Sequence, residues 1–140
     1  MKAHLTRRYH FSASHRLHNV QMSDQENRRV YGKCNNPHGH GHNYTLEVTV
    51  AGQVNPRTGM VCDLVELDAY VERGVLQRFG HENLNHLEPF QSVVPTTENL
   101  CVEIYELVAR GFRSAEVEKI RLEETMMNSF EYYGHAKGKQ

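Results

Sequence analysis

Three histidines have the spacing that most directly suggests chemistry in this sequence. His40 and His42 are two residues apart, and alternate residues of a β-strand point to the same face, so the pair can present two imidazoles together. His15 has the inward position on an earlier predicted strand and can supply a third nitrogen. Three protein ligands leave one zinc position open for water or substrate, as in catalytic sites. We predict a three-histidine metal site, although the alternation also permits the pair His38 and His40.

Three other side chains are candidates for proton transfer or binding. Cys34, in the turn-rich run 34–37, is a candidate base or nucleophile, because a nearby metal or basic group would favour its thiolate. His81 follows a predicted helix in a loop, where catalytic groups are common, although this signal alone is weak. Glu124 shares the apolar face of a late strand. A carboxylate there either has a salt-bridge partner or receives two parallel N–H donors from a ligand.

The elements that must position these residues follow from the hydrophobic pattern. Asp63 with Glu66 resembles a capping box at the start of one helix, and a second helix begins near Thr96 or Thr97 and ends at Gly111. Residues 60–62 are predicted to be extended, and residues 18–39 have no sustained pattern, which is typical of a functional loop. The predicted order is β-β-α-α-β-β in an α+β fold, with strands over 5–15, 40–50, 118–124 and 129–133 and helices over 63–79 and 96–111.

Length and charge restrict the class of protein. The 140 residues fit a single domain, 1–140, and no apolar run approaches the roughly 18 residues of a membrane span. No secretion signal is visible, so we expect a cytoplasmic protein with free cysteines rather than disulfides. The net charge of −1 argues against a general nucleic-acid or membrane binder. Residues 1–33 nevertheless carry +5 against −6 in the remainder, so an anion site would draw on the N-terminal quarter.

Four motifs together make the sequence resemble a known family. The chain is similar, over about residues 9–134, to the 6-pyruvoyl-tetrahydropterin synthase family, which includes the 6-carboxytetrahydropterin synthases of the queuosine and deazapurine pathway. The motifs that carry the resemblance are FSASHRL at 11–17, CNNPHGHGHNY at 34–44, TTEN at 96–99 and ET at 124–125. In combination they are highly specific.

The resemblance implies both an architecture and a reaction. The fold would be the tunnelling fold, a four-stranded antiparallel sheet with two helices on one face. Three subunits would close a barrel, and two barrels would stack into a homohexamer. The substrate would be 7,8-dihydroneopterin triphosphate, which loses triphosphate and undergoes internal redox in its side chain to give 6-pyruvoyl-tetrahydropterin. A magnesium ion could accompany the triphosphate.

The resemblance also implies a role for each metal-binding and catalytic residue. The zinc ligands would be His15, His40 and His42. The general base would be Cys34, and the second acid or base would be His81.

Five residues would contact the substrate. Glu124 would anchor the pterin ring, and Thr96, Thr97 and Glu98 would help to hold it. The sequence has no Walker-type phosphate loop, so basic side chains must bind the triphosphate, with Arg16 as our choice.

The sequence departs from the family pattern at one catalytic position. The family usually has an aspartate immediately before the catalytic histidine, where it orients the imidazole, and this chain has Gly80. Loss of such a carboxylate can lower the rate by orders of magnitude. Another carboxylate must substitute, with Glu82 the nearest in sequence, or activity is reduced. A weakly active or non-catalytic pterin- and zinc-binding homologue therefore remains an alternative.

The spacing between the cysteine and the histidines leaves a further alternative. Pyruvoyl-type enzymes have five residues between the cysteine and His-Gly-His, and carboxy-type enzymes have three. This chain satisfies both, through His40 and His42 or through His38 and His40. We prefer the five-residue register, because the motif sequences on either side resemble the pyruvoyl type. A 6-carboxytetrahydropterin synthase is the alternative enzyme.

Overall fold

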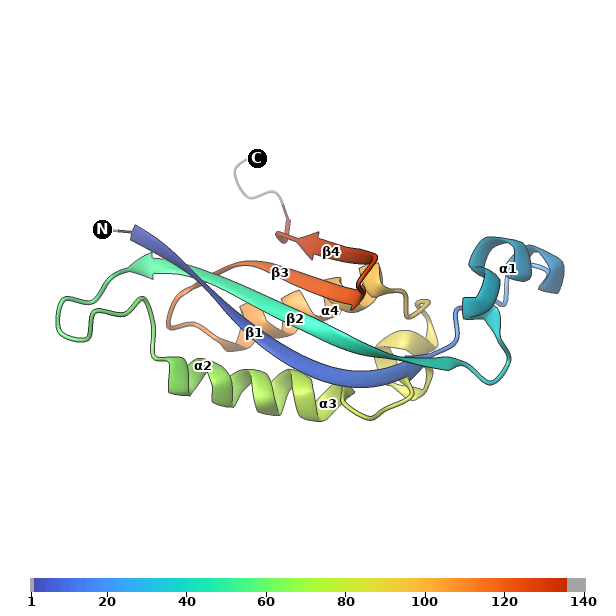
Figure 1. Cartoon of the computed structure of the whole chain (residues 1–140), viewed down its shortest axis with the longest axis horizontal. Helices are drawn as coiled ribbons and strands as arrows, with labels where there is room; N and C mark the ends of the chain where they lie inside the picture. The colour runs from blue at the N-terminus through green and yellow to red at the C-terminus, as the bar shows by residue number, and fades with distance from the viewer. Residues whose placement is uncertain (1, 136–140) are drawn as a thin grey trace.

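The computed structural model describes residues 2–135 of the chain. Its centre is a four-stranded antiparallel sheet in the order β1-β2-β3-β4 (Figure 1). The sheet is formed by β1 (Lys2–His15), β2 (His40–Gln53), β3 (Glu116–Thr125) and β4 (Asn128–Tyr132). The four predicted strands are thus confirmed, and each of the first two is longer than the region where its alternation is clear.

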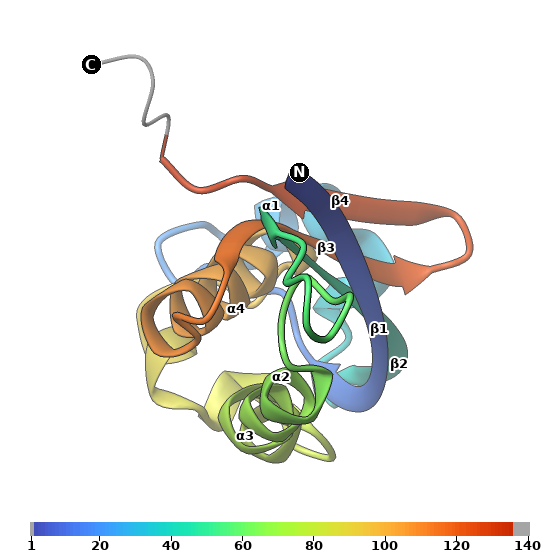
Figure 2. The same ribbon diagram turned by 90° about the vertical axis from the view of Figure 1, so that its left-hand side faces the viewer.

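Two helical segments cover one face of the sheet (Figure 2). The first runs continuously through α2 (Leu64–Val71), a π-helical turn η2 (Glu72–Leu76) and α3 (Gln77–Phe79). The second is α4 (Thr97–Gly111). The Asp63 and Thr96 side chains cap the two segments by accepting hydrogen bonds from first-turn backbone N–H groups. Both helices confirm the prediction.

The core lies between the sheet and these helices. Alternate residues of β2 point toward the helices, as the period of two requires. Helices and strands together contribute fully buried side chains, among them Leu46, Val48, Val50, Leu67 and Ile104. The opposite face of the sheet has no helix over it in the described part of the chain and is polar, with ion pairs from Glu47 to both Arg8 and Arg121.

Two segments differ from the prediction. The residues predicted as an unpatterned loop contain α1 (Asp24–Tyr31) and the 3₁₀ turn η1 (Gly32–Asn35), which lie beyond one end of the sheet (Figure 1). Ser23 caps α1 by accepting a hydrogen bond from the Glu26 backbone N–H. The cap and the side chain of Asn27 stabilise this short, polar helix, which has too few apolar residues for a periodic signal. Residues 60–62, predicted as extended, are not part of a strand.

The remaining turns and the strand register bring the site together. Two 3₁₀ turns, η3 (Leu84–His86) and η4 (Glu88–Gln91), connect α3 to α4. On the sheet, His15 pairs directly with His40, at the end of the β1–β2 ladder beside α1. Across the described residues, every helix is too short or too polar to cross a membrane.

Candidate metal and active site

The three predicted histidines converge at the end of the β1–β2 ladder. Ring centroids are 4.8 Å apart for His15 and His40, 5.0 Å for His15 and His42, and 4.7 Å for His40 and His42. Each pair of rings is nearly perpendicular. Gly39, with φ of +73°, turns the chain into β2, and a Cβ there would lie only 3.0 Å from the His15 carbonyl oxygen. Glycine therefore permits the close approach that places His40 opposite His15.

His38, the alternative ligand from the spacing, lies outside this cluster. It precedes β2 and is exposed. The structure therefore favours the register in which His40 and His42 join His15.

The hydrogen bonds of His15 prepare it to bind a cation. Its ring is fully buried, and Nδ1 lies 2.9 Å from the carbonyl oxygen of Pro95. A carbonyl only accepts, so Nδ1 carries the proton and Nε2 keeps its lone pair. Within residues 2–135, Nε2 of His15 and Nε2 of His42 are buried without a hydrogen-bond partner. Burial, the largest effect, lowers the pKa of His15 to about 4.

These features fit a zinc ion. Metal-binding histidines generally donate their second N–H to a carbonyl or carboxylate, as His15 does to Pro95. Neutral imidazole nitrogens without another partner are suitable zinc ligands. Burial also lowers the pKa of His40, and the charge of His42 adds to this effect. Both shifts favour the neutral, metal-binding form of the ring.

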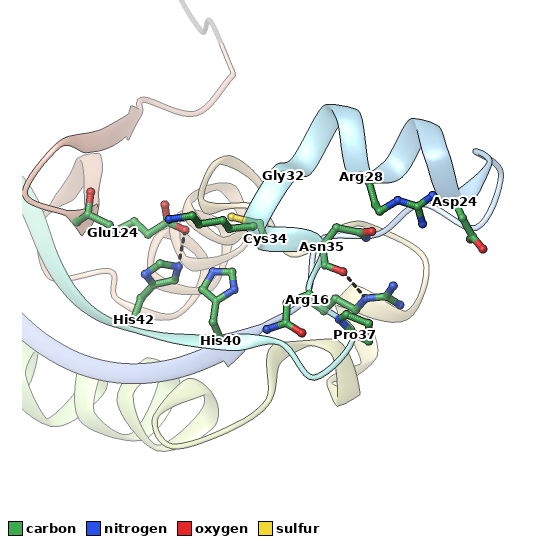
Figure 3. A pocket seen from close by; sticks show the side chains of 13 residues that line it. Arg16, Asp24, Arg28, Gly32, Cys34, Asn35, Pro37, His40, His42 and Glu124 are labelled. Atoms are coloured by element: carbon green, nitrogen blue, oxygen red, sulfur yellow. Dashed lines mark hydrogen bonds and ion pairs between the residues drawn. The ribbon is translucent and has the colours of Figure 1, made fainter.

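Cys34 and Glu124 both lie beside the histidines, with Glu124 next to His42 and Cys34 next to His40 (Figure 3). Ligand atoms of His15, Cys34 and His40 lie within 4.8 Å of one another, and so do those of His15, His42 and Glu124. Glu124 Oε2 is 3.4 Å from His42 Nε2 and 3.7 Å from His15 Nε2. Its other oxygen accepts a hydrogen bond from Asn128. On the side of the site, the carboxylate therefore lies beside two histidine ring nitrogens.

The loop that carries Cys34 is held by its neighbour Asn35. The buried Asn35 amide donates to the Leu17 carbonyl and lies 2.9 Å from His18 Nδ1. Leu17 N–H donates in turn to the Cys34 carbonyl. Burial and then the charge of Glu124 raise the pKa of the Cys34 thiol. The surrounding protein groups by themselves therefore do not favour the thiolate, and of the two groups that we expected to favour it, the metal is the one that remains.

A single cavity of about 920 Å³ joins these groups to a basic surface. Its lining includes Cys34, His40, His42 and Glu124 at one end and Arg16 at the other (Figure 3). Arg16 is held in place because its Nε donates to the Asn35 carbonyl. Arg16, the residue predicted to bind the triphosphate, therefore shares one cavity with Cys34, with two of the predicted zinc ligands and with Glu124.

Tyr44 is a site-adjacent residue that the sequence reasoning missed. It is fully buried on the same face of β2 as the histidines, its ring packs 5.8 Å from that of His42, and its hydroxyl has no hydrogen-bond partner within residues 2–135. Burial and the charges of Glu124 and Cys34 raise its pKa, so it stays a neutral hydrogen-bond donor. The strand alternation from His40 through His42 could have identified it.

His81 lies at a different surface from Cys34. It lines a smaller cavity with Ser12 and Asn43, whose side chains belong to the opposite face of the β1–β2 pair. The His81 N–H donates to the Ser12 carbonyl at the outer edge of β1, and φ of His81 is +60°. Glu82 lines the same cavity. A single chain thus does not bring His81 and Cys34 together.

The close packing around Gly80 leaves no space for the family's aspartate. Its φ of −66° and ψ of 133° are accessible to any residue. A Cβ at this position, however, would lie 2.5 Å from the carbonyl oxygen of Leu76. Glycine is required here by contact rather than by backbone conformation.

The predicted pterin-holding residues also lie outside the cavity of Cys34. Thr96 caps α4, Thr97 is buried with an unpaired hydroxyl, and Glu98 is exposed in the first turn. All three follow Pro95, whose carbonyl orients His15. Among the described residues, none of these three side chains lines the cavity.

Comparison with known proteins agrees with this arrangement. A family model described as 6-pyruvoyl tetrahydropterin synthase matches residues 4–135. The 6-pyruvoyl tetrahydrobiopterin synthase of Poecilia reticulata is 47% identical over 132 residues, covering 94% of this chain and 90% of that protein. The human protein of the same name is 44% identical over 134 residues, covering 95% and 92%. The structure of Caenorhabditis elegans 6-pyruvoyl tetrahydropterin synthase matches with a TM-score of 0.90 and 40% identity, covering 96% of each chain.

These matches identify the fold first and the family second. The four-stranded antiparallel sheet with helices on one face is the subunit architecture of the tunnelling fold, as predicted. The chain belongs to the 6-pyruvoyl tetrahydropterin synthase family.

Proposed function

We propose that this protein is a zinc-dependent 6-pyruvoyl-tetrahydropterin synthase-type lyase that eliminates triphosphate from 7,8-dihydroneopterin triphosphate. The observation that carries the proposal is the convergence of His15, His40 and His42 with Cys34 and Glu124 at one cavity. Membership of the family supplies the substrate and reaction class.

His15, His40 and His42 would hold the zinc ion. A cation there would polarise the hydroxyl groups of the substrate side chain, acidify the adjacent C–H bonds and favour the thiolate of Cys34. Cys34 and Glu124 also lie within reach of the same centre, and we assign them to the substrate rather than to the metal. The fourth position is thereby left for the substrate.

The protein groups divide the remaining tasks. Cys34 accepts the proton that leaves the substrate side chain, because its sulfur borders the histidines in the cavity. Glu124 accepts two parallel N–H donors from the edge of the pterin ring. His81 returns a proton to the side chain. Triphosphate leaves with the electrons of the broken C–O bond, toward Arg16.

The separation of Cys34 and His81 requires two copies of the chain at each site. β1 and β4 are the outer strands of the sheet formed by the described residues, and the outer strands of a sheet can pair with another strand. Closure of such sheets into a barrel would remove both edges. We propose that a neighbouring copy brings His81 to the cavity of Cys34, in the homohexamer expected from the resemblance. Thr96, Thr97 and Glu98 would enter through the same assembly.

Product identification tests this function. Zinc-loaded protein is incubated with 7,8-dihydroneopterin triphosphate, with and without Mg²⁺, and the pterin product is identified by mass spectrometry. We expect 6-pyruvoyl-tetrahydropterin, and a loss of rate of about 100-fold or more in Cys34→Ala, as is typical for removal of a general base.

Two other outcomes would replace the proposal with an alternative. A 6-carboxytetrahydropterin product would make the chain a carboxy-type enzyme. Substrate that binds but is not converted would indicate a pterin- and zinc-binding homologue, for which the close packing at Gly80 offers a reason. Turnover that is the same in Cys34→Ala would refute the role of Cys34.

A further inference from the structure

The end of the cavity farthest from Glu124 is lined by two arginines. Arg28 belongs to α1 and Arg16 follows the end of β1, while Lys33 of η1 also lines the cavity. Figure 3 shows Arg16 and Arg28 at one end and His42 and Glu124 at the other. Two segments separated in sequence therefore place positive charge at one end of a single cavity.

The charges of Arg28 and Lys33 are not balanced by partners in the described part of the chain. Neither side chain makes a hydrogen bond or ion pair within residues 2–135, and both are exposed. Arg29, the next residue of α1, pairs instead with Glu26 at 3.7 Å and does not line the cavity. One carboxylate, Asp24, lies at the same end of the cavity and opposes the two arginines.

The backbone beneath these cations is rigidly held. The fully buried Asn27 donates to the carbonyls of Asn19, Met22 and Ser23, and accepts from the Asn19 N–H. Four hydrogen bonds thus anchor α1, although the helix is short and lies outside the main core. The Arg16 backbone is fixed in the same way, by two hydrogen bonds with the Asn85 side chain.

We propose that Arg28, together with Arg16, forms a binding subsite for a polyphosphate chain at this end of the cavity. Arginine forks match pairs of phosphate oxygens, and a guanidinium without a protein partner gains charge-assisted hydrogen bonds from such a ligand. The proposal deepens the proposed function, on which the identity of the natural ligand rests. The acidic end at Glu124 and the basic end at Arg28 then fix the direction in which a pterin triphosphate enters.

Binding of inorganic tripolyphosphate tests the subsite without using the reaction. The dissociation constant is measured by calorimetry on zinc-loaded protein, and zinc content is measured before and after to exclude chelation. We expect Arg28→Ala to weaken binding by roughly tenfold, the loss of one charge-assisted hydrogen bond. Arg29→Ala removes the same charge from the same helix and should leave binding nearly unchanged. Equal losses in the two variants would overturn the proposal.

A variant at Asp24 tests the sign of the effect. Asp24→Asn removes the opposing carboxylate at the rim and should tighten tripolyphosphate binding several-fold, because the repulsion between like charges is removed. Glu26→Gln, on the outer part of the same helix, is the matched control. Weaker binding in Asp24→Asn would contradict an anion subsite at this position.

Substrate specificity separates this proposal from the proposed function. Arg28→Ala should raise the KM for 7,8-dihydroneopterin triphosphate about tenfold, while the affinity for 7,8-dihydroneopterin, which lacks the phosphates, should not change. Turnover of the triphosphate with no effect of Arg28→Ala would refute the subsite and leave the reaction standing. If tripolyphosphate binding depends on Arg28 but the protein does not turn over the pterin triphosphate, the subsite stands and the proposed function is refuted.

Discussion

At the scale of single residues, His15 is the key to the metal site. One ring nitrogen is committed to the Pro95 carbonyl, and the other is buried without a protein partner. An unpaired buried polar atom costs free energy, so this arrangement has a cost unless a ligand uses the lone pair. The same ligand would satisfy the bare Nε2 of His42.

Zinc content distinguishes the ligand set from its neighbours. Because Cys34 also lies within reach of the centre, the structure alone permits a competing set. We expect Cys34→Ala to retain one zinc per chain after dialysis, and His40→Ala and His42→Ala to bind it more than about 100-fold more weakly. His38→Ala, at an exposed position before the strand, is the control and should bind normally. Loss of zinc in Cys34→Ala with retention in His42→Ala would contradict the assignment.

The buried His15 also predicts how metal-free protein responds to acid. Its pKa of about 4 is below the ordinary value near 6.5, so between these pH values only the unfolded chain takes up the proton. The free energy of unfolding should therefore fall by up to about 3 kcal/mol as pH decreases from 6.5 to 4, with no contribution above 6.5. Urea unfolding at several pH values measures this, with His15→Asn as the reference. Parallel pH profiles for the two proteins would be inconsistent with a buried, neutral His15.

Much of the residue-level site could be predicted from sequence because strand alternation is a strict geometric rule. His15, His40 and His42 share a face for this reason alone, and Glu124 joins them from β3. The role of Arg28 could not be predicted in this way. Its place in the cavity depends on a helix held by side-chain hydrogen bonds of Asn27, which leave no periodic pattern in the sequence.

At the scale of elements, the fold was predictable where apolar faces are long. The strands and the two covering helices bury continuous apolar faces. The N-caps of the two helices, Asp63 and Thr96, can be recognised in the sequence. The segment from 18 to 39 was predicted incorrectly as a loop, because α1 has one fully buried residue, the polar Asn27. Its capping signal, Ser23 with Glu26, was the available clue.

The end of α3 predicts the effect of restoring the family's aspartate. A side chain at position 80 would meet the Leu76 carbonyl oxygen, so the end of the helix must shift. We expect both Gly80→Asp and Gly80→Ala to lower the free energy of unfolding by about 1–3 kcal/mol, the usual cost of overpacking, measured by urea unfolding. Their kcat values should be similar and not above that of the natural protein.

Both variants add a Cβ at position 80, so the difference between them measures the effect of the carboxylate alone. A Gly80→Asp protein that is at least as stable as the natural one and about tenfold faster than Gly80→Ala would contradict this account. The natural chain would then be an enzyme weakened by loss of its aspartate. Our interpretation is instead that the backbone of His81, held by Ser12 at the β1 edge, positions the imidazole.

At the scale of the whole molecule, the separation of two cavities is the dominant feature. The cavities of Cys34 and His81 lie on different faces of the β1–β2 pair. Among the described residues, His42 alone lines both cavities. Contacts made by residues from separate subunits are not readable from the periodicity of one chain. The proposed chemistry therefore depends on assembly, and a chain confined to the monomer should bind zinc without turning over the substrate.

Complementation between two inactive variants tests this central claim most directly. Cys34→Ala and His81→Ala chains carrying different affinity tags are co-expressed, and mixed oligomers are isolated by successive purification on both tags. With random assembly from equal amounts, about one quarter of the sites combine an intact Cys34 from one copy with an intact His81 from its neighbour. We predict a recovery of about one quarter of the natural activity. Mixed oligomers of the correct size that remain as inactive as the single variants would contradict a site shared between subunits.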